Sequence, residues 1–166
     1  MHKIPGVSVI MSVFNGEDFL ADAIKSVLNQ TFTNFEFIIV DDGSNDSSLA
    51  IIQSFQELDS RIKIIVHKNQ GLAKSLNIGI EHSIGKYIAR IDADDLCYES
   101  RLEKQYAFME ENHAVDLIGS SVDVINEDGS ITTSKKQITD FENIGQYTKY
   151  LSFLFNLQVQ PLEQIY

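Results

Sequence analysis

The sequence has little positive charge and a single cysteine. Its 166 residues include 13 Lys and Arg against 24 Asp and Glu, which gives a net charge of −11. Binding to nucleic acid regardless of its sequence needs clustered Lys and Arg, so the composition argues against nucleic acid as a partner. The same deficit disfavours electrostatic docking onto an anionic membrane. Cys97 has no second cysteine to pair with, so nothing in the sequence points to an oxidising compartment.

Long apolar runs are missing as well. The longest apolar stretches without charge are residues 7–14 and 150–159, and both are far shorter than the roughly 20 apolar residues that span a bilayer. The N-terminus reaches Pro5 and Gly6 before any apolar run begins, which is not the pattern of a signal peptide. We therefore expect a cytoplasmic protein without a transmembrane segment.

Short apolar runs alternate with segments of helical period along most of the chain. The apolar runs predict four strands, at residues 7–13, 35–40, 62–66 and 87–91. Apolar residues at helical spacing predict a helix after each strand. The residues that carry these four helices are Leu20, Ile24, Val27 and Leu28; Leu49, Ile52, Phe55 and Leu58; Leu72, Leu76 and Ile80; and Leu102, Tyr106 and Met109. This alternation implies right-handed crossovers, and hence an α/β fold with an open, mainly parallel sheet flanked by helices. Beyond Asn112 we expect a hairpin that turns at residues 127–129 and a last helix within residues 141–155.

Three of the predicted strands end in polar, acid-rich turns, at residues 15–18, 41–46 and 92–95. Ligands of open α/β sheets bind outside the carboxyl ends of the strands, where the second and third turns should meet. Two carboxylates ~4 Å apart repel by about 4 kcal/mol at an effective dielectric of 20. A divalent ion, Mg²⁺ or Mn²⁺, is the simplest compensation, and strand alternation should point Asp92 and Asp94 to the same side. The alternative is that these acids only form turns and cap helices.

Several familiar signatures are absent. No Gly-x-Gly-x-x-Gly follows the first predicted strand and no P-loop occurs, which removes the usual dinucleotide and P-loop interpretations. The four histidines lack metal-ligand spacing, and Ser44 has no adjacent histidine that could serve as a base. A phosphoacceptor receiver domain also gathers acids at strand ends, but it needs an acid pair where Asn15-Gly16 stands here.

Four segments make the sequence recognisable. They are Val-Ser-Val-Ile-Met-Ser-Val-Phe-Asn-Gly (7–16), Ser-Val-Leu-Asn-Gln-Thr (26–31), Val-Asp-Asp-Gly-Ser (40–44) and Ile-Asp-Ala-Asp-Asp (91–95), in that order. Together they resemble the family 2 glycosyltransferases of the GT-A fold, over about residues 6 to 130. Residues 71–77 and 101–105 look like the bacterial branch that builds capsular, O-antigen and other surface polysaccharides.

The resemblance implies a nucleotide-sugar donor, usually a UDP-sugar, and an inverting transfer to a saccharide or lipid-linked acceptor. Ser12 and Phe14 match positions that line the uracil pocket in the family, and Asp42 matches the acid that contacts the base. Because acceptors in this branch are often lipid-linked, peripheral association with a membrane stays open although the chain shows no anchor of its own.

The resemblance also implies a metal site. Asp92 and Asp94 match the Asp-x-Asp motif of the family, in which Asp94 would ligate Mn²⁺ or Mg²⁺ and Asp92 would lie near the ribose or a metal-bound water. Asp95 would extend the acidic turn toward the sugar. Lys74 and Arg90 would add positive charge beside the phosphates, and the alternative for each is a solvated or ion-paired side chain.

The sequence departs from the family at three places. Ser12 stands where many relatives have proline, and Glu99 replaces a proline that is common just after the acidic turn. The third departure is the C-terminal part. We expect residues 1–130 to form the donor-binding core and residues 131–166 the start of a truncated or divergent acceptor region, with no residue matching the general base of the family. An inactive, donor-binding fragment is the alternative to an active transferase.

Overall fold

A computed structural model describes residues 4–126 and 130–135. These residues fall into two units that divide after Ala107, and each unit is described by itself. The predicted helix within residues 141–155 and the predicted turn at 127–129 lie outside the described residues. The domain boundary expected after residue 130 stays a prediction.

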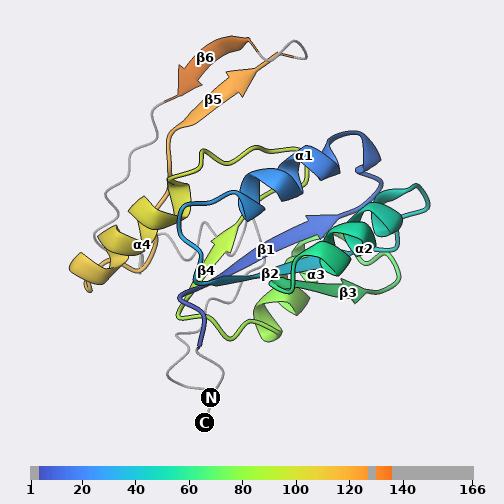
Figure 1. Cartoon of the computed structure of the whole chain (residues 1–166), viewed down its shortest axis with the longest axis horizontal. Helices are drawn as coiled ribbons and strands as arrows, with labels where there is room; N and C mark the ends of the chain where they lie inside the picture. Colours follow the sequence, from blue (N-terminus) through green and yellow to red (C-terminus); the bar gives the residue numbers. More distant parts are fainter. Residues whose placement is uncertain (1–3, 127–129, 136–166) are drawn as a thin grey trace. The chain divides into compact units, whose positions relative to one another are not determined.

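Four parallel strands form the sheet of the first unit (Figure 1). They are β1 (Val7–Val13), β2 (Phe35–Asp41), β3 (Ile62–Val66) and β4 (Tyr87–Arg90). Their order across the sheet is β3-β2-β1-β4, so β1 lies between β2 and β4. Val7 pairs with Phe35 on one side and with Tyr87 on the other. The carboxyl ends of β1, β2 and β4 therefore open at the same edge of the sheet.

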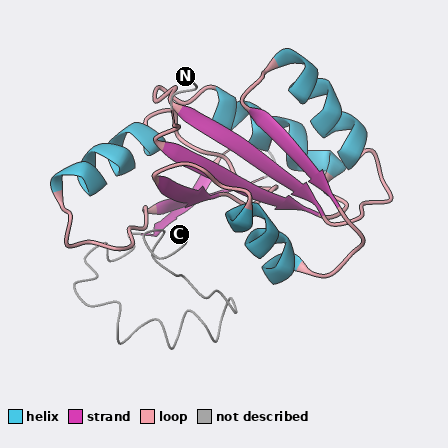
Figure 2. Cartoon of the chain, turned by 90° about the horizontal axis from the view of Figure 1, so that it is seen from below, coloured by secondary structure: helices cyan, strands magenta, loops and turns pink. Residues whose placement is uncertain are grey.

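Helices cover both faces of this sheet (Figure 2). The described helices are α1 (Glu17–Leu28), α2 (Ser48–Leu58), α3 (Leu72–Glu81) and α4 (Arg101–Glu111). Helices α1 and α2 contact each other, and α3 packs against β1 and β2. On the α3 face, Gly79 of that helix lies directly over Ile10 and near Val40. Coverage on both faces explains why every residue of β2 is buried.

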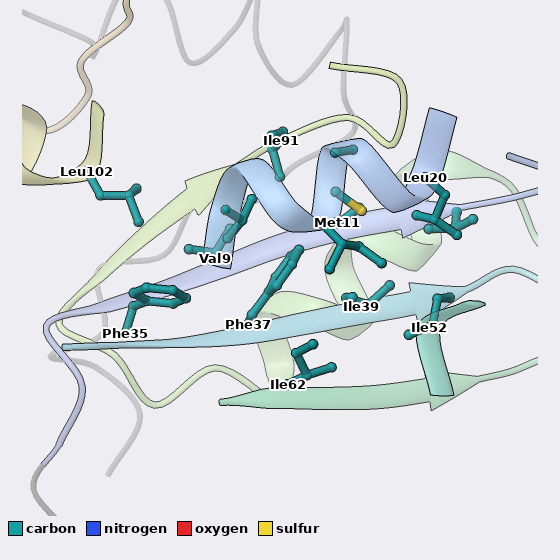
Figure 3. Close-up of a cluster of buried hydrophobic side chains, with 14 of the residues drawn as sticks. Val9, Met11, Leu20, Phe35, Phe37, Ile39, Ile52, Ile62, Ile91 and Leu102 are labelled. Carbon is teal, nitrogen blue, oxygen red and sulfur yellow. The ribbon is translucent and has the colours of Figure 1, made fainter. Parts of the chain in front are cut away.

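The main apolar core lies between the sheet and α1 (Figure 3). Met11, Phe37 and Ile39 project from the strands and meet Leu20 and Ile24 of α1. Each of these five side chains is fully buried, and burying a side chain of this size contributes roughly 1.5–3 kcal/mol relative to leaving it exposed. The sheet and the first helix therefore form a firm support for the loops at the carboxyl edge.

The second unit contains an antiparallel pair, β5 (Val122–Ile125) and β6 (Ile131–Lys135), with an irregularity between Val124 and Ile125. This pairing confirms the predicted hairpin. Within the described residues, no helix has both the length and the apolar character needed to cross a membrane. The α/β fold class and the parallel sheet are confirmed, and β4 ends one residue before the predicted limit.

Candidate functional site

A pocket of about 460 Å³ lies at the carboxyl edge of the sheet. Its lining comes from the end of β1 and the following turn, from the first residues of α1 and α3, and from the turn after β4. The lining residues are Ser12, Phe14, Asn15, Gly16, Phe19, Leu72, Asp92, Ala93 and Asp94. The strand order changes direction between β1 and β4, because β2 follows β1 on one side while β4 lies on the other. Ligands of open α/β sheets bind at such a switch point.

The structure brings together four of the residues predicted from the sequence. Ser12, Phe14, Asp92 and Asp94 all line this pocket. Asp42 and Lys74 do not line it. Phe14 is half exposed, and Phe19 and Leu72 are similarly exposed around the same opening. The pocket therefore combines an apolar part with an acidic part.

The acidic part is the turn formed by residues 92–95, which we call the acidic turn. Strand β4 ends at Arg90, and the backbone N–H of Asp95 donates to the carbonyl of Asp92 at 3.2 Å. A turn, rather than the strand alternation expected from the sequence, therefore brings Asp92 and Asp94 to the same pocket. Within the part of the chain that the structure describes, Asp94 makes no hydrogen bond or ion pair.

Arg90 pairs with Asp92 through two of its nitrogens. Its Nε lies 3.0 Å from Oδ1 of Asp92, and its Nη2 lies 2.8 Å from Oδ1 and 3.0 Å from Oδ2. A second arginine, Arg101, donates from Nη2 to the backbone carbonyl of Arg90 at 2.8 Å. The ion-paired alternative for Arg90 is therefore what the structure shows, and its partner belongs to the acidic turn itself.

The pKa of Asp95 is raised by burial and by the neighbouring carboxylates of this turn. Desolvation raises the pKa of Asp95, and the carboxylates of Asp92 and Asp94 raise it further, while Arg101 and Arg90 act in the opposite direction. The two arginines therefore already supply part of the compensation for which the sequence alone suggested a divalent ion.

The donor set still suits such an ion. No group of three or more His, Cys, Asp or Glu side chains converges on one point among the residues described. Mg²⁺ is commonly bound through one or two carboxylates together with the phosphates of a substrate, and it keeps several waters. Asp94, with Asp92 beside it, provides this kind of partial coordination in an accessible pocket, so the residues present fit Mg²⁺ or Mn²⁺.

The side chains of residues 44–48, after β2, bind backbone N–H groups at the start of α1. The backbone N–H groups of Asn15, Gly16 and Glu17 donate to Ser44 Oγ, Ser48 Oγ and Asp46 Oδ2, at 3.0, 2.9 and 3.1 Å. These bonds satisfy N–H groups at the start of α1, which Gly16 cannot cap with a side chain of its own. The structural alternative, helix capping, is therefore the observed role of Asp46.

Asp42 is almost fully buried and holds the loop between β3 and α3. Its Oδ1 accepts from the backbone N–H of Gln70 at 2.7 Å, and its Oδ2 accepts from that of Gly71 at 2.9 Å. His67 Nδ1 lies 3.3 Å from the same Oδ1. Lys74 is exposed on α3, two residues beyond Leu72 of the pocket lining.

Sequence reasoning did not select Asn15, Gly16, Phe19 or Leu72 for the pocket. A signal existed for Phe19, which lies beside Leu20 outside the apolar face of α1 and is 60% exposed. Asn15 adopts a φ of 52°, a left-handed conformation that asparagine tolerates better than most residues, and this turns the chain from β1 into α1. The sequence predicts a turn at residues 15–18, but it does not predict that Asn15 and Gly16 line a pocket.

The comparisons with known proteins identify the family of the chain. The sequence matches the profile of Glycosyl transferase family 2 over residues 8–161. An uncharacterized glycosyltransferase of Haemophilus influenzae is 42% identical over 128 residues, which are 76% of this chain and 40% of the relative. The putative glycosyltransferase EpsE of Bacillus subtilis is 44% identical over 131 residues, which are 78% of this chain and 47% of that relative. The chain thus spans less than half the length of these two relatives.

Solved structures share the fold. Residues 1–349 of TarS from S. aureus give a TM-score of 0.61 at 28% identity, over 64% of this chain and 33% of that one. The same TarS fragment in complex with UDP-GlcNAc gives 0.62 at 24% identity, over 72% and 40% of the two chains. The mannosyltransferase PcManGT from Pyrobaculum calidifontis, in complex with GDP-Man and Mn²⁺, gives 0.63 at 21% identity, over 74% and 37%. The solved structures and the parallel sheet show a fold of the GT-A type, and the profile match over residues 8–161 establishes that the chain belongs to glycosyl transferase family 2.

Proposed function

We propose that the pocket binds a nucleotide-sugar, with a UDP-sugar as the first candidate, for inverting transfer of the sugar to a saccharide or lipid-linked acceptor in surface-polysaccharide synthesis. One observation carries the proposal: Ser12, Phe14, Asp92 and Asp94, which were selected from family motifs far apart in the sequence, line one pocket. Membership of glycosyl transferase family 2 supplies the type of reaction.

The two parts of the pocket suit the two parts of such a donor. Phe14, Phe19 and Leu72 offer apolar and aromatic surface to a base or sugar ring. Asp92 and Asp94 would repel a bare diphosphate, so a cation has to lie between the carboxylates and the phosphates. Asp94, with Asp92 beside it, would hold Mg²⁺ or Mn²⁺. When bound, such an ion neutralises the charge that develops on the departing nucleoside diphosphate.

Asp42 and Lys74 stay predictions with a smaller structural basis. Both carboxylate oxygens of Asp42 already accept backbone hydrogen bonds, so contact with a base would have to share or replace one of them. Replacing Asp42 with alanine would also release the loop that carries Gln70 and Gly71. A loosened loop alone should weaken UDP and GDP alike and should not reverse the preference between them. The contribution of Asp42 to base recognition is therefore best measured as the ratio of the affinities for UDP and GDP.

The test is a calorimetric titration of UDP into the purified chain, first with Mn²⁺ and then with EDTA. We expect binding that depends on the metal. Asp94→Asn should weaken metal-dependent UDP affinity by at least about a hundredfold, since altering groups around a bound metal costs about 10- to 100-fold even beyond the direct ligands. Asp22→Asn is the matched control, because Asp22 lies exposed on α1 and outside the pocket.

The outcomes separate the possible activities. Metal-dependent binding followed by transfer or hydrolysis of a UDP-sugar supports the transferase. Binding without turnover favours the alternative of a donor-binding chain that does not transfer. Absence of binding under both conditions, in a protein shown to be folded, would refute the proposal. Equal metal-dependent affinity in Asp94→Asn and wild type would remove Asp94 as a ligand of the metal.

A further inference from the structure

The pair between Arg90 and Asp92 occupies both oxygens of a carboxylate that lines the pocket. Nε and Nη2 of Arg90 make three contacts of 2.8–3.0 Å with Oδ1 and Oδ2 of Asp92. A guanidinium and a carboxylate in this two-pronged arrangement form a strong and directional pair. An ion that approaches the pocket therefore meets Asp92 with its charge already compensated, and Asp94 without such a partner in the described residues.

The position of Arg90 is itself supported. Arg90 is the last residue of β4, and its backbone carbonyl accepts from Nη2 of Arg101 at 2.8 Å. Arg101 also donates from Nη1 to Sγ of Cys97 at 3.0 Å, so it ties the strand end to the segment after the acidic turn. Arg90 is only two residues before Asp92 in the chain. Arg101 contacts the residues on both sides of the acidic turn, Arg90 and Cys97, and so holds the backbone that carries the pair.

We propose that Arg90 is a positioning residue that occupies Asp92 as an internal cation in the metal-free protein, and thereby leaves Asp94 as the acid open to a divalent ion and keeps the affinity for that ion low in the nucleotide-free protein. The proposal rests on the proposed function of the pocket. The proposal gives Arg90 a role that opposes metal binding, whereas the family resemblance suggested that Arg90 adds positive charge beside the phosphates.

The size of the effect follows from the charges. At an effective dielectric near that of water, a unit positive charge about 6 Å from a divalent ion weakens its binding by roughly tenfold. Removing the charge of Arg90 should therefore tighten the binding of Mn²⁺ to the nucleotide-free protein by about tenfold. An ion pair that lies away from the pocket has no such consequence, because its charge is too distant from the metal ion to change the binding of that ion.

The chain contains a matched control pair. Arg61 binds Asp59, again two residues away, through Nε and Nη2 at 2.7–3.2 Å, and both side chains are partly buried. This pair precedes β3 and no member of it lines the pocket. Arg61→Gln therefore removes an arginine from the same kind of pair at a place where metal affinity should not respond.

The experiment measures free Mn²⁺ by electron paramagnetic resonance during titration of the full chain without nucleotide, and again with UDP. We expect Arg90→Gln to lower the Kd for Mn²⁺ about tenfold in the absence of UDP. Arg90→Lys keeps the charge and should gain less, and Arg61→Gln should match wild type. Asp94→Asn should abolish the gain when it is combined with Arg90→Gln.

The outcomes distinguish failure of the role of Arg90 from failure of the proposed metal site. Unchanged or weaker Mn²⁺ binding in Arg90→Gln, while wild type binds Mn²⁺ with UDP, overturns the role of Arg90 and leaves the proposed function standing. If Arg90→Gln does not fold, Arg90→Met, which also removes the charge, decides, and affinity equal to wild type overturns the role. Failure of wild type to bind Mn²⁺ even with UDP refutes the metal site and the role of Arg90 together.

Discussion

Replacing Gln30 with alanine should destabilise the first unit strongly, although Gln30 lies outside the pocket. Its side chain is 4% exposed and joins the end of α1 to the segment after the acidic turn. Nε2 donates to the carbonyls of Tyr98 and Ser26 at 2.8 and 3.1 Å, and Oε1 accepts from the N–H of Leu102 at 2.9 Å. That N–H belongs to the first turn of α4, where no helical carbonyl is available to accept it.

The magnitude follows from these three bonds. A typical intramolecular hydrogen bond contributes about 1 kcal/mol net, and a buried donor left without a partner costs about 1–3 kcal/mol. Gln30→Ala should therefore lower the free energy of unfolding by about 3 kcal/mol. Gln30→Met, which keeps most of the volume but none of the hydrogen bonds, should lose most of the same amount.

Urea unfolding followed by circular dichroism measures the loss. Gln53→Ala is the control, because Gln53 is exposed on α2, and a substitution of this kind should change stability by less than about 0.5 kcal/mol. A loss below about 1 kcal/mol for Gln30→Ala would show that the segment after the acidic turn does not depend on these hydrogen bonds. A large loss for Ala with none for Met would assign the effect to packing instead.

Two further predictions concern the sheet. Gly79→Ala should destabilise by about 1–3 kcal/mol in urea unfolding, because the new Cβ would lie 2.5 Å from Cγ2 of Ile10; a gain in stability would show that helix propensity outweighs this contact. Burial raises the pKa of Glu36, but hydrogen bonds from Lys63, Ser8 and the backbone of Ile84 outweigh it and hold the pKa below its usual range. The contribution of Glu36 to stability is therefore present above its unfolded pKa and is lost as the pH falls through the lower folded pKa. Glu36→Gln should therefore make the free energy of unfolding fall less steeply with decreasing pH in the acid range. An unchanged acid range would contradict the lowered pKa of Glu36.

The sheet could be predicted from the sequence because its strands are marked by composition alone. Both faces are covered, so β1 and β2 appear as nearly continuous apolar runs, and the predicted limits of β1 and β3 agree with the structure. The apolar pattern of α1 begins only at Leu20, although the helix begins at Glu17. Its first turn carries Glu17 and Asp18 in place of apolar residues, and its N–H groups are satisfied by Ser48 and Asp46 from another loop. Capping across about 30 residues leaves no local pattern.

The acidic clusters show a second limit of sequence reasoning. The sequence predicts acidic turns that meet at one edge of the sheet, and a metal ion is the simplest compensation for the repulsion among their carboxylates. In the structure Arg90 compensates Asp92 directly, while Asp46 serves backbone N–H groups. Compensation by arginine and by backbone dipoles depends on side-chain direction, which spacing in the sequence does not determine. The acids at residues 92–95 therefore predicted the position of the pocket better than the way in which its charge is balanced.

The family motifs gain a common physical meaning once α1 is considered as one rigid element. Phe19 in its first turns lines the pocket, and the loop at residues 44–48 fixes its start. At its other end, Ser26 Oγ accepts from the N–H of Cys97 at 3.0 Å, and Gln30 holds the next residues. The motifs at 7–16, 40–44 and 26–31 thus mark the two ends of a single helix, and that helix joins the pocket wall to the segment that follows the acidic turn. A substitution at Gln30 should therefore reach the pocket through the position of that segment rather than by contact with a ligand.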